Sequence, residues 1–133
     1  MLFRSLCSIV SIGLLSSTKV NIRSSKEISE ISYYLSKKEI ANNSIINFST
    51  WGGYLQQSIY GNSSQIVTMT APISAELASK VNNLRIKKNR KYILNICYSC
   101  SIGDIKQMFS SAKNVEIVEL KTNIWKVLKI SYE

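Results

Sequence analysis

The run from Tyr92 to Tyr98 is apolar at almost every position, with Ile93, Leu94 and Ile96 in its middle. A strand that exposes one face to water alternates apolar and polar residues, whereas a strand covered on both faces is apolar along its length. The run therefore predicts a strand that is buried on both sides. With 133 residues, the chain is long enough to bury such a strand in one domain and too short for two comfortable domains.

Two other segments place apolar residues at the spacing of a helix. The first follows Ser24 and Glu27, which have the spacing of a capping box, and extends to Ile40. The second begins at Pro72, which can occupy the first turn of a helix without losing a needed N–H, and extends to Leu84. We expect one helix in each segment.

Several β-rich runs complete the first hundred residues. The loosely alternating run 2–12 predicts a first strand. The run 45–50, continued through 55–59, predicts a second strand, and 65–70 predicts a third. Residues 60–64 have the composition of a turn, so we expect the second and third strands to form a hairpin.

The expected order of elements in residues 1–100 is βαββαβ, the split βαβ arrangement of a ferredoxin-like sandwich. The fold class that we expect is therefore α+β, with a ferredoxin-like domain over these residues.

The remaining residues, 101–133, are unlike a disordered tail. Ser101 and Asp104 have capping-box spacing, and two β-rich runs follow at 115–121 and 124–132. We expect a C-terminal extension made of a helix and a β-hairpin, packed on or beside the ferredoxin-like domain. No repeat or low-complexity linker separates the two parts.

The chain is strongly basic, with 17 Lys and Arg against 8 Asp and Glu, a net charge of +9 and a pI of about 9.6. Such a balance indicates a polyanionic partner, either a nucleic acid or an acidic membrane surface. Five of the cations lie within seven residues at the junction between the second expected helix and the buried strand: Arg85, Lys87, Lys88, Arg90 and Lys91. Such a cluster can meet successive phosphates of RNA, although cations at the end of a helix are also favourable without any partner.

Aromatic residues next to glycines offer a second kind of nucleic-acid contact. Trp51 and Tyr54 flank Gly52 and Gly53, and aromatic rings can stack on unpaired bases. For Trp51 we expect packing in the core instead, because large aromatic side chains are most often buried. Tyr54 faces either RNA or a partner protein.

Catalysis and metal binding are not expected. The chain has no histidine, its carboxylates are scattered, and no glycine-rich loop is followed by Lys and Ser or Thr. Cys97 and Cys100 form a C-x-x-C pair, which is the pattern of a redox or zinc half-site. With only Cys7 left the chain cannot supply four thiolates, so zinc would need a carboxylate ligand or a partner chain. We interpret Cys97 and Cys100 as small apolar side chains of a reduced protein, and we expect no cofactor and no enzymatic activity.

The first 26 residues are basic, rich in serine and free of acids, which is typical of a mitochondrial transit peptide. The apolar stretch 2–15 is too short to span a bilayer. We treat the segment as structure that also resembles a targeting sequence, and we count Arg4 within it among the candidate RNA-binding residues. An AT-rich bacterial source or a plastid would fit the composition equally well.

Three stretches between Trp51 and Ile96 share the order and spacing of a known family. These are Trp51-Gly52 followed by Leu55 and Ile59, Ala71-Pro72 opening a helix, and Leu84-Arg85-Ile86 followed by a basic turn and the apolar run from Tyr92. In these stretches the chain resembles the sixth protein of the bacterial-type small ribosomal subunit, in its mitochondrial form. That family has arginines where this chain has Gly53 and Tyr54.

The resemblance implies a structural constituent of the small subunit of a mitochondrial ribosome, located in the matrix. Its partners would be small-subunit ribosomal RNA and neighbouring ribosomal proteins, the eighteenth protein of that subunit first among them. The candidate RNA-binding residues are Arg4, Tyr54, Arg85, Lys87, Lys88, Arg90 and Lys91. The alternative is a protein-interaction subunit of a membrane-associated organelle complex, with the apolar N-terminal stretch on the lipid.

Overall fold

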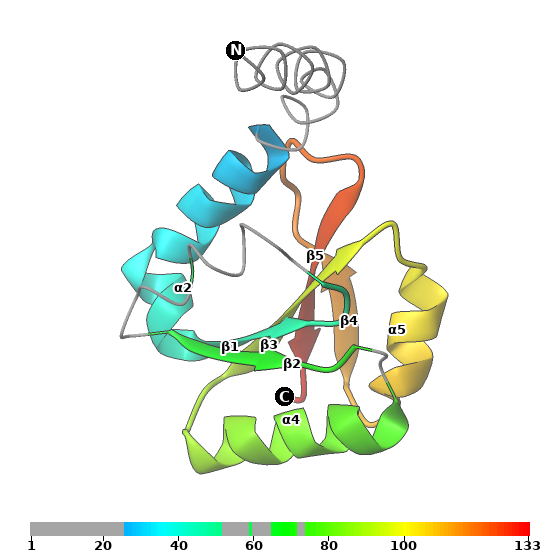
Figure 1. Cartoon of the computed structure of the whole chain (residues 1–133). Coiled ribbons are helices and arrows are strands. Elements are labelled where there is room, and N and C mark those ends of the chain that lie inside the picture. The colour runs from blue at the N-terminus through cyan, green and yellow to red at the C-terminus, as the bar shows by residue number, and fades with distance from the viewer. Residues whose placement is uncertain (1–25, 52–58, 60–64, 72–73) are drawn as a thin grey trace, which may run out of the picture.

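The computed structural model describes residues 26–51, 59, 65–71 and 74–133. A five-stranded sheet forms its middle layer, and helices lie on both faces (Figure 1). The described helices are residues 26–36, α2 (Lys38–Asn43), α4 (Ala75–Lys87) and α5 (Ile102–Met108). The strands are β1 (Ser44–Phe48), β2 (Ile66–Met69), β3 (Tyr92–Tyr98), β4 (Asn114–Ile117) and β5 (Trp125–Ser131).

The strands are arranged in the order β2-β1-β3-β5-β4. Strand β1 pairs in parallel with both β2 and β3, whereas β5 pairs antiparallel with both β3 and β4. The sheet is therefore mixed, with a parallel half made by the first three strands and an antiparallel half made by the C-terminal hairpin.

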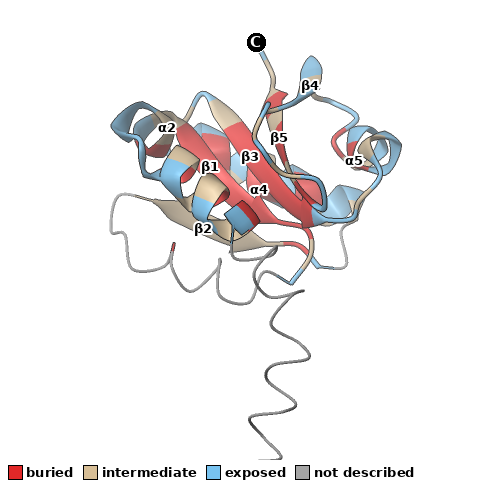
Figure 2. Cartoon of the chain, turned by 90° about the horizontal axis from the view of Figure 1, so that it is seen from above, coloured by how far each residue is buried: buried red, intermediate tan, exposed pale blue. Residues whose placement is uncertain are grey.

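Two apolar cores form because neighbouring residues of each strand point to opposite faces. On one face, Ile46 and Phe48 pack with Ile31 and Leu35 of the helix 26–36. The other face packs against α4 and α5 through a second set of buried side chains: Ile45, Ile93, Leu128 and Ile130 of the sheet with Ala78, Val81, Ile105 and Phe109. Figure 2 shows the buried residues as a band along β1, β3 and β5.

The prediction that residues 92–98 form a strand covered on both sides is confirmed. Ile93, Leu94 and Ile96 are fully buried, and β3 lies at the centre of the five strands. The C-terminal helix and hairpin are also confirmed as α5 and the antiparallel pair β4 and β5. Because β5 lies between β3 and β4, this C-terminal part is built into the sheet.

The predicted hairpin between 45–59 and 65–70 is wrong. Ile45 to Phe48 pair in parallel with Ile66 to Met69, so the connection between them is a crossover and not a tight turn. Ile59, expected near the end of a long strand, is helical and buried. The fold is thus α+β as expected. The expected hairpin requires β2 to be antiparallel to β1, and in the structure the two strands are parallel. The expected first strand, 2–12, lies outside the described residues.

The first expected helix is divided into two. The hydroxyl of Ser36 donates to the carbonyl of Tyr33 at 2.7 Å, and Lys37 has an extended backbone. A side-chain hydroxyl that bonds the preceding turn competes with the helical ladder, which explains the break before α2.

The side chain of Glu27 is hydrogen bonded to the loop before β5. Its carboxylate accepts hydrogen bonds from the backbone N–H of Asn123 and, at 3.0 Å, from that of Ile124. Glu27 is buried, so it connects the start of the helix 26–36 to the loop before β5.

Candidate nucleic-acid interface

The turn after α4 has a defined geometry that holds the basic cluster. Lys88 ends the helix, and Asn89 follows with a φ of 53°, in the left-handed region. The N–H of Asn89 donates to the carbonyl of Ile86 at 3.0 Å, and the N–H of Arg90 donates to that of Arg85 at 3.0 Å. These two bonds make a Schellman motif, the usual way to satisfy the last carbonyls of a helix.

Arg85 is buried inside this turn. Its Nε donates to Asn82 Oδ1 at 2.9 Å and its Nη1 donates to the carbonyl of Arg90 at 3.0 Å. The guanidinium also lies over the ring of Tyr132, 4.6 Å from its centre. Because these contacts occupy the guanidinium and leave Arg85 only 8% exposed, its role in the structure is to hold the turn.

Arg90 connects the turn to α2. Its Nη1 donates to the carbonyl of Ala41 at 2.6 Å, and the neighbouring N–H of Lys91 donates to the carbonyl of Asn43 at 2.8 Å. The end of α2, the start of β3 and the end of α4 are therefore joined at one corner of the fold.

The remaining cations of the cluster are Lys87, Lys88 and Lys91, which we call the lysine corner. All three are exposed. None of them forms an ion pair with any residue that the structure describes. The salt bridge that is found among these residues joins Lys80 to Glu76, within α4. The lysine corner is thus a set of uncompensated positive charges on a backbone fixed by hydrogen bonds.

The other sequence-predicted residues are not brought to this corner. Arg4 and Tyr54 lie outside the described residues. Trp51 was expected in the core, and that expectation is wrong, because its side chain is 75% exposed. It follows β1 at the carboxyl end of the parallel strands, where Tyr98 of β3 is also exposed, whereas the lysine corner lies at their amino end.

A buried polar cluster lies within the sheet and was not predicted from the sequence. The side-chain amide of Asn47 donates to Thr70 Oγ1 at 3.0 Å and to Asn95 Oδ1 at 2.7 Å. Thr68 donates to Asn47 Oδ1 at 2.8 Å, and Asn95 donates to Ser49 Oγ at 3.0 Å. The cluster joins β2, β1 and β3 beneath the surface, so it orders the strands and presents no reactive group to solvent.

Three tyrosines are partly enclosed by the fold. Burial raises the pKa of Tyr34, Tyr92 and Tyr132 above the ordinary value of 10.0. Nearby Arg85 opposes this rise in the pKa of Tyr132. Lys129 lies over the ring of Tyr92, 4.5 Å from its centre.

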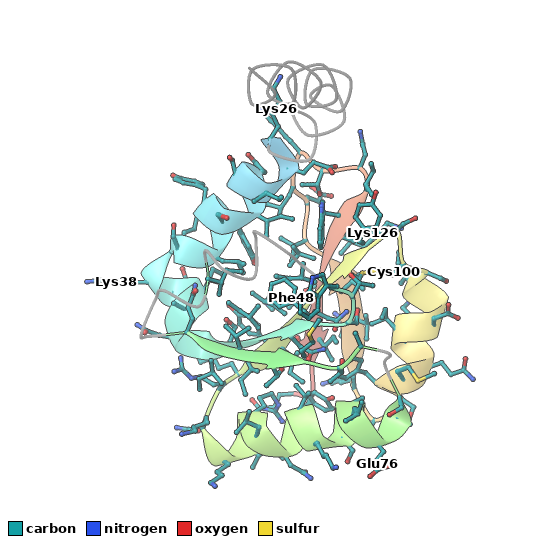
Figure 3. The ribbon with its side chains drawn as sticks, viewed as in Figure 1. Lys26, Lys38, Phe48, Glu76, Cys100 and Lys126 are labelled. Carbon is teal, nitrogen blue, oxygen red and sulfur yellow. A yellow bond between two sulfur atoms is a disulfide. The ribbon has the colours of Figure 1, made fainter. Side chains whose placement is uncertain are left out.

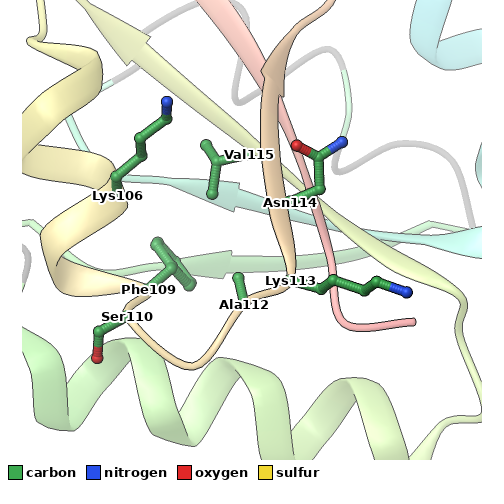
Figure 4. Close-up of a pocket in the computed structure, with 7 residues that line it drawn as sticks. All are labelled: Lys106, Phe109, Ser110, Ala112, Lys113, Asn114 and Val115. Atoms are coloured by element: carbon green, nitrogen blue, oxygen red, sulfur yellow. The ribbon is translucent and has the colours of Figure 1, made fainter.

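A pocket of about 250 Å³ lies between α5 and β4 (Figure 4). Phe109, Ala112 and Val115 form its apolar part, and Lys106, Ser110, Lys113 and Asn114 form its polar part. The lining has no carboxylate and no thiol, so this lining lacks the paired groups that acid–base or covalent catalysis needs.

The interpretation of Cys97 and Cys100 as two separate apolar side chains is corrected by the structure, in which their sulfurs are joined in a disulfide. The described residues hold no group of three or more metal-ligating side chains. They also hold no helix that is both long and apolar enough to cross a membrane.

Local sequence signals could have identified parts of this interface before the structure. Asn89 is a residue that tolerates the left-handed conformation, so it marked the Schellman turn. Nothing in the sequence distinguished buried Arg85 from the exposed lysines beside it.

Comparison of the chain with family models, with curated proteins and with solved structures finds no match.

Proposed function

We propose that this chain is a non-catalytic RNA-binding protein, and that it is a structural constituent of the small subunit of a mitochondrial ribosome. The observation that carries the proposal is the lysine corner, three exposed and uncompensated lysines on a turn that hydrogen bonds hold rigid. The net charge of the chain, +9, supports the same class of partner.

The lysine corner would bind phosphates and not bases. Ammonium groups are point charges that neutralise phosphates and release counterions, so affinity falls steeply as salt rises. A rigid corner keeps the three charges at a fixed spacing, which favours an RNA whose folded backbone presents phosphates at that spacing. Specificity would thus come from the shape of the RNA.

The ribosomal setting comes from the resemblance to the sixth small-subunit protein. Two described features have the order expected of that family: α4 follows Ala71, and a basic turn then leads into β3. The parallel pairing of β1 with β2 departs from that family's hairpin, so the proposal rests on charge and on the lysine corner. Small-subunit ribosomal RNA is the proposed ligand, and the eighteenth protein of the subunit is the proposed protein neighbour.

The test is a binding titration with the full chain and a transcript of the central domain of small-subunit RNA. A triple variant, Lys87→Gln, Lys88→Gln and Lys91→Gln, is compared with a matched control, Lys106→Gln, Lys113→Gln and Lys121→Gln, which removes the same charge from other exposed positions. We expect the corner variant to bind at least about tenfold more weakly at moderate salt. The slope of log affinity against log salt should fall by about 2 to 3.

The control should retain most of the affinity and of the salt slope. Equal losses in the two variants would mean that overall charge, and not the corner, binds the RNA, and would overturn the assignment of the site. Vesicles with anionic lipids are a parallel probe. Binding to vesicles with no measurable binding to RNA would reject the ribosomal proposal in favour of a membrane-associated role.

A further inference from the structure

Cys97 and Cys100 stand where β3 ends and the loop to α5 begins. Cys97 is the next to last residue of the strand, and Cys100 lies three positions after it, two beyond the end of the strand. Their Cα atoms are 5.8 Å apart. Their sulfurs are bonded. We propose that this pair is a thiol–disulfide exchange site, which takes two electrons from a dithiol partner and returns them to a disulfide partner.

The two cysteines differ in burial, which gives the exchange a direction. Cys97 is fully buried and packs among Ile105, Phe109 and Leu128. Cys100 is only partly buried. Of the two residues, Cys100 is therefore the one that an attacking thiolate would meet from outside, and the sulfur of Cys97 would be the leaving group.

A positive charge lies beside the accessible cysteine. The ammonium group of Lys126, on β5, donates to the backbone carbonyl of Cys100 at 3.1 Å, and Figure 3 shows the two residues on the same side of the fold. Reactive cysteines sit in partly exposed, electropositive surroundings because a nearby cation stabilises the thiolate. Cys100 meets both conditions.

The loop between the cysteines is held in place by bonds other than the disulfide. The N–H of Tyr98 donates to Thr50 Oγ1 at 2.7 Å, and the N–H of Ser99 donates to the carbonyl of Ile124 at 2.9 Å. A disulfide that closes so short a loop also constrains the unfolded chain little. The dithiol form can thus keep the same backbone, and exchange does not require unfolding.

Reduced Cys97 would have a partner within the fold. Its sulfur lies 3.9 Å from the carbonyl oxygen of Lys126, which can accept a weak hydrogen bond from the thiol. The buried thiol is therefore accommodated without an orphaned polar group.

Reduction by a dithiol takes place in two exchange steps. One thiolate of the reductant attacks the sulfur of Cys100, the bond between Cys100 and Cys97 breaks, and Cys97 leaves as a thiolate that takes up a proton. The second thiol of the reductant loses its proton and attacks its own sulfur in the mixed disulfide, releasing Cys100. The protein gains two electrons and two protons, and the reductant becomes a disulfide.

The experiment uses the full chain with Cys7→Ser, so that only the two proposed sulfurs can react. The folded protein is equilibrated in mixtures of reduced and oxidised dithiothreitol and of reduced and oxidised glutathione, and exchange is then stopped with acid. The quenched protein is unfolded and labelled with a maleimide that adds mass, so that the buried Cys97 is also reached. We expect two labels under reducing conditions and none under oxidising conditions, with a sharp transition between them and no change in the far-ultraviolet circular dichroism spectrum. Two labels at every ratio, or reduction only after urea is added, would overturn the proposal.

Single variants test the direction of attack. With Cys97→Ser, Cys100 is left free and should form a mixed disulfide with glutathione disulfide at least about tenfold faster than Cys97 does in the Cys100→Ser variant. Adding Lys126→Gln should slow the reaction of Cys100 several-fold. Equal rates at the two cysteines in folded protein would contradict the assignment. These readouts do not depend on RNA binding, so either proposal can fail without the other.

Discussion

Asn47 on β1 donates a hydrogen bond from its side-chain amide to Asn95 Oδ1 on β3, at a distance of 2.7 Å. Both side chains are fully buried, and the two residues are direct partners in the parallel register. Buried amides are tolerated only when they are hydrogen bonded, and a displaced register would leave them unpaired. The pair therefore favours one alignment of two strands that otherwise meet largely through similar aliphatic side chains, among them Ile46 and Leu94.

The change Asn47→Ala should lower the free energy of unfolding by about 1 to 3 kcal/mol. It removes the hydrogen bonds that Asn47 donates to two buried acceptors, Asn95 Oδ1 and Thr70 Oγ1. It also takes from the hydroxyl of Thr68 one of its two acceptors. Urea denaturation measures the change. The control is Asn83→Ala on the exposed face of α4, for which we expect a change within about 0.5 kcal/mol. Similar small effects of both substitutions would show that the buried cluster does not order the sheet.

The change Arg85→Lys tests whether this residue holds the turn or binds RNA. Lysine keeps the charge but cannot reproduce the planar fork that bonds Asn82 and Arg90 and lies over Tyr132. We expect a loss of about 1 to 3 kcal/mol in unfolding free energy, and RNA affinity within about twofold of the parent while the protein is folded. Unchanged stability with a large loss of RNA affinity would instead make Arg85 a phosphate ligand.

The change Asn89→Ala should be destabilising, and Asn89→Gly should not. Asn89 has a φ of 53°, which costs a residue with a Cβ about 1 to 2 kcal/mol unless, like asparagine, it can form local hydrogen bonds. Glycine adopts this conformation freely, so Asn89→Gly should remain within about 0.5 kcal/mol of the parent. Thermal and urea unfolding of the two variants provide the comparison. An alanine variant as stable as the glycine variant would contradict the Schellman turn.

The stability of the protein should fall as pH rises above about 10. Burial raises the pKa of Tyr92 and Tyr132 in the folded state. Above the ordinary tyrosine pKa the unfolded chain has lost these protons while the folded chain still holds them, so deprotonation favours unfolding. The stabilising effect of the two protonated tyrosines is complete below the tyrosine pKa of the unfolded chain. It is lost as the pH rises through the higher tyrosine pKa of the folded protein.

Urea titrations between pH 8 and about pH 11 measure this dependence, with Tyr92→Phe and Tyr132→Phe as variants. Each should make the decline less steep, because one linked proton is removed. The matched control is Tyr33→Phe, at a residue that is 70% exposed. A decline that is unaffected by the first two substitutions would assign the alkaline loss of stability to other groups.

Several elements could be predicted from the sequence because their signals are local. The apolar run from Tyr92 to Tyr98 is β3, the amphipathic stretch before it is α4, and the last third forms a helix and a hairpin. Hydrophobic period depends on residues a few positions apart, so it can be interpreted without knowledge of the rest of the chain. The basic cluster and its place at the end of a helix were visible for the same reason.

Tertiary structure decided the direction of β2, the burial of Arg85 and the exposure of Trp51. A run such as Ile66 to Met69 has the same alternation whether its neighbour is parallel or antiparallel, so its direction depends on which distant strand it meets. Arg85 is buried because Tyr132, from the end of the chain, covers it. The sequence by itself thus determined the charge and the elements with strong local periodicity. Pairing and exposure were decided by contacts between residues far apart in the chain, which no local pattern encodes.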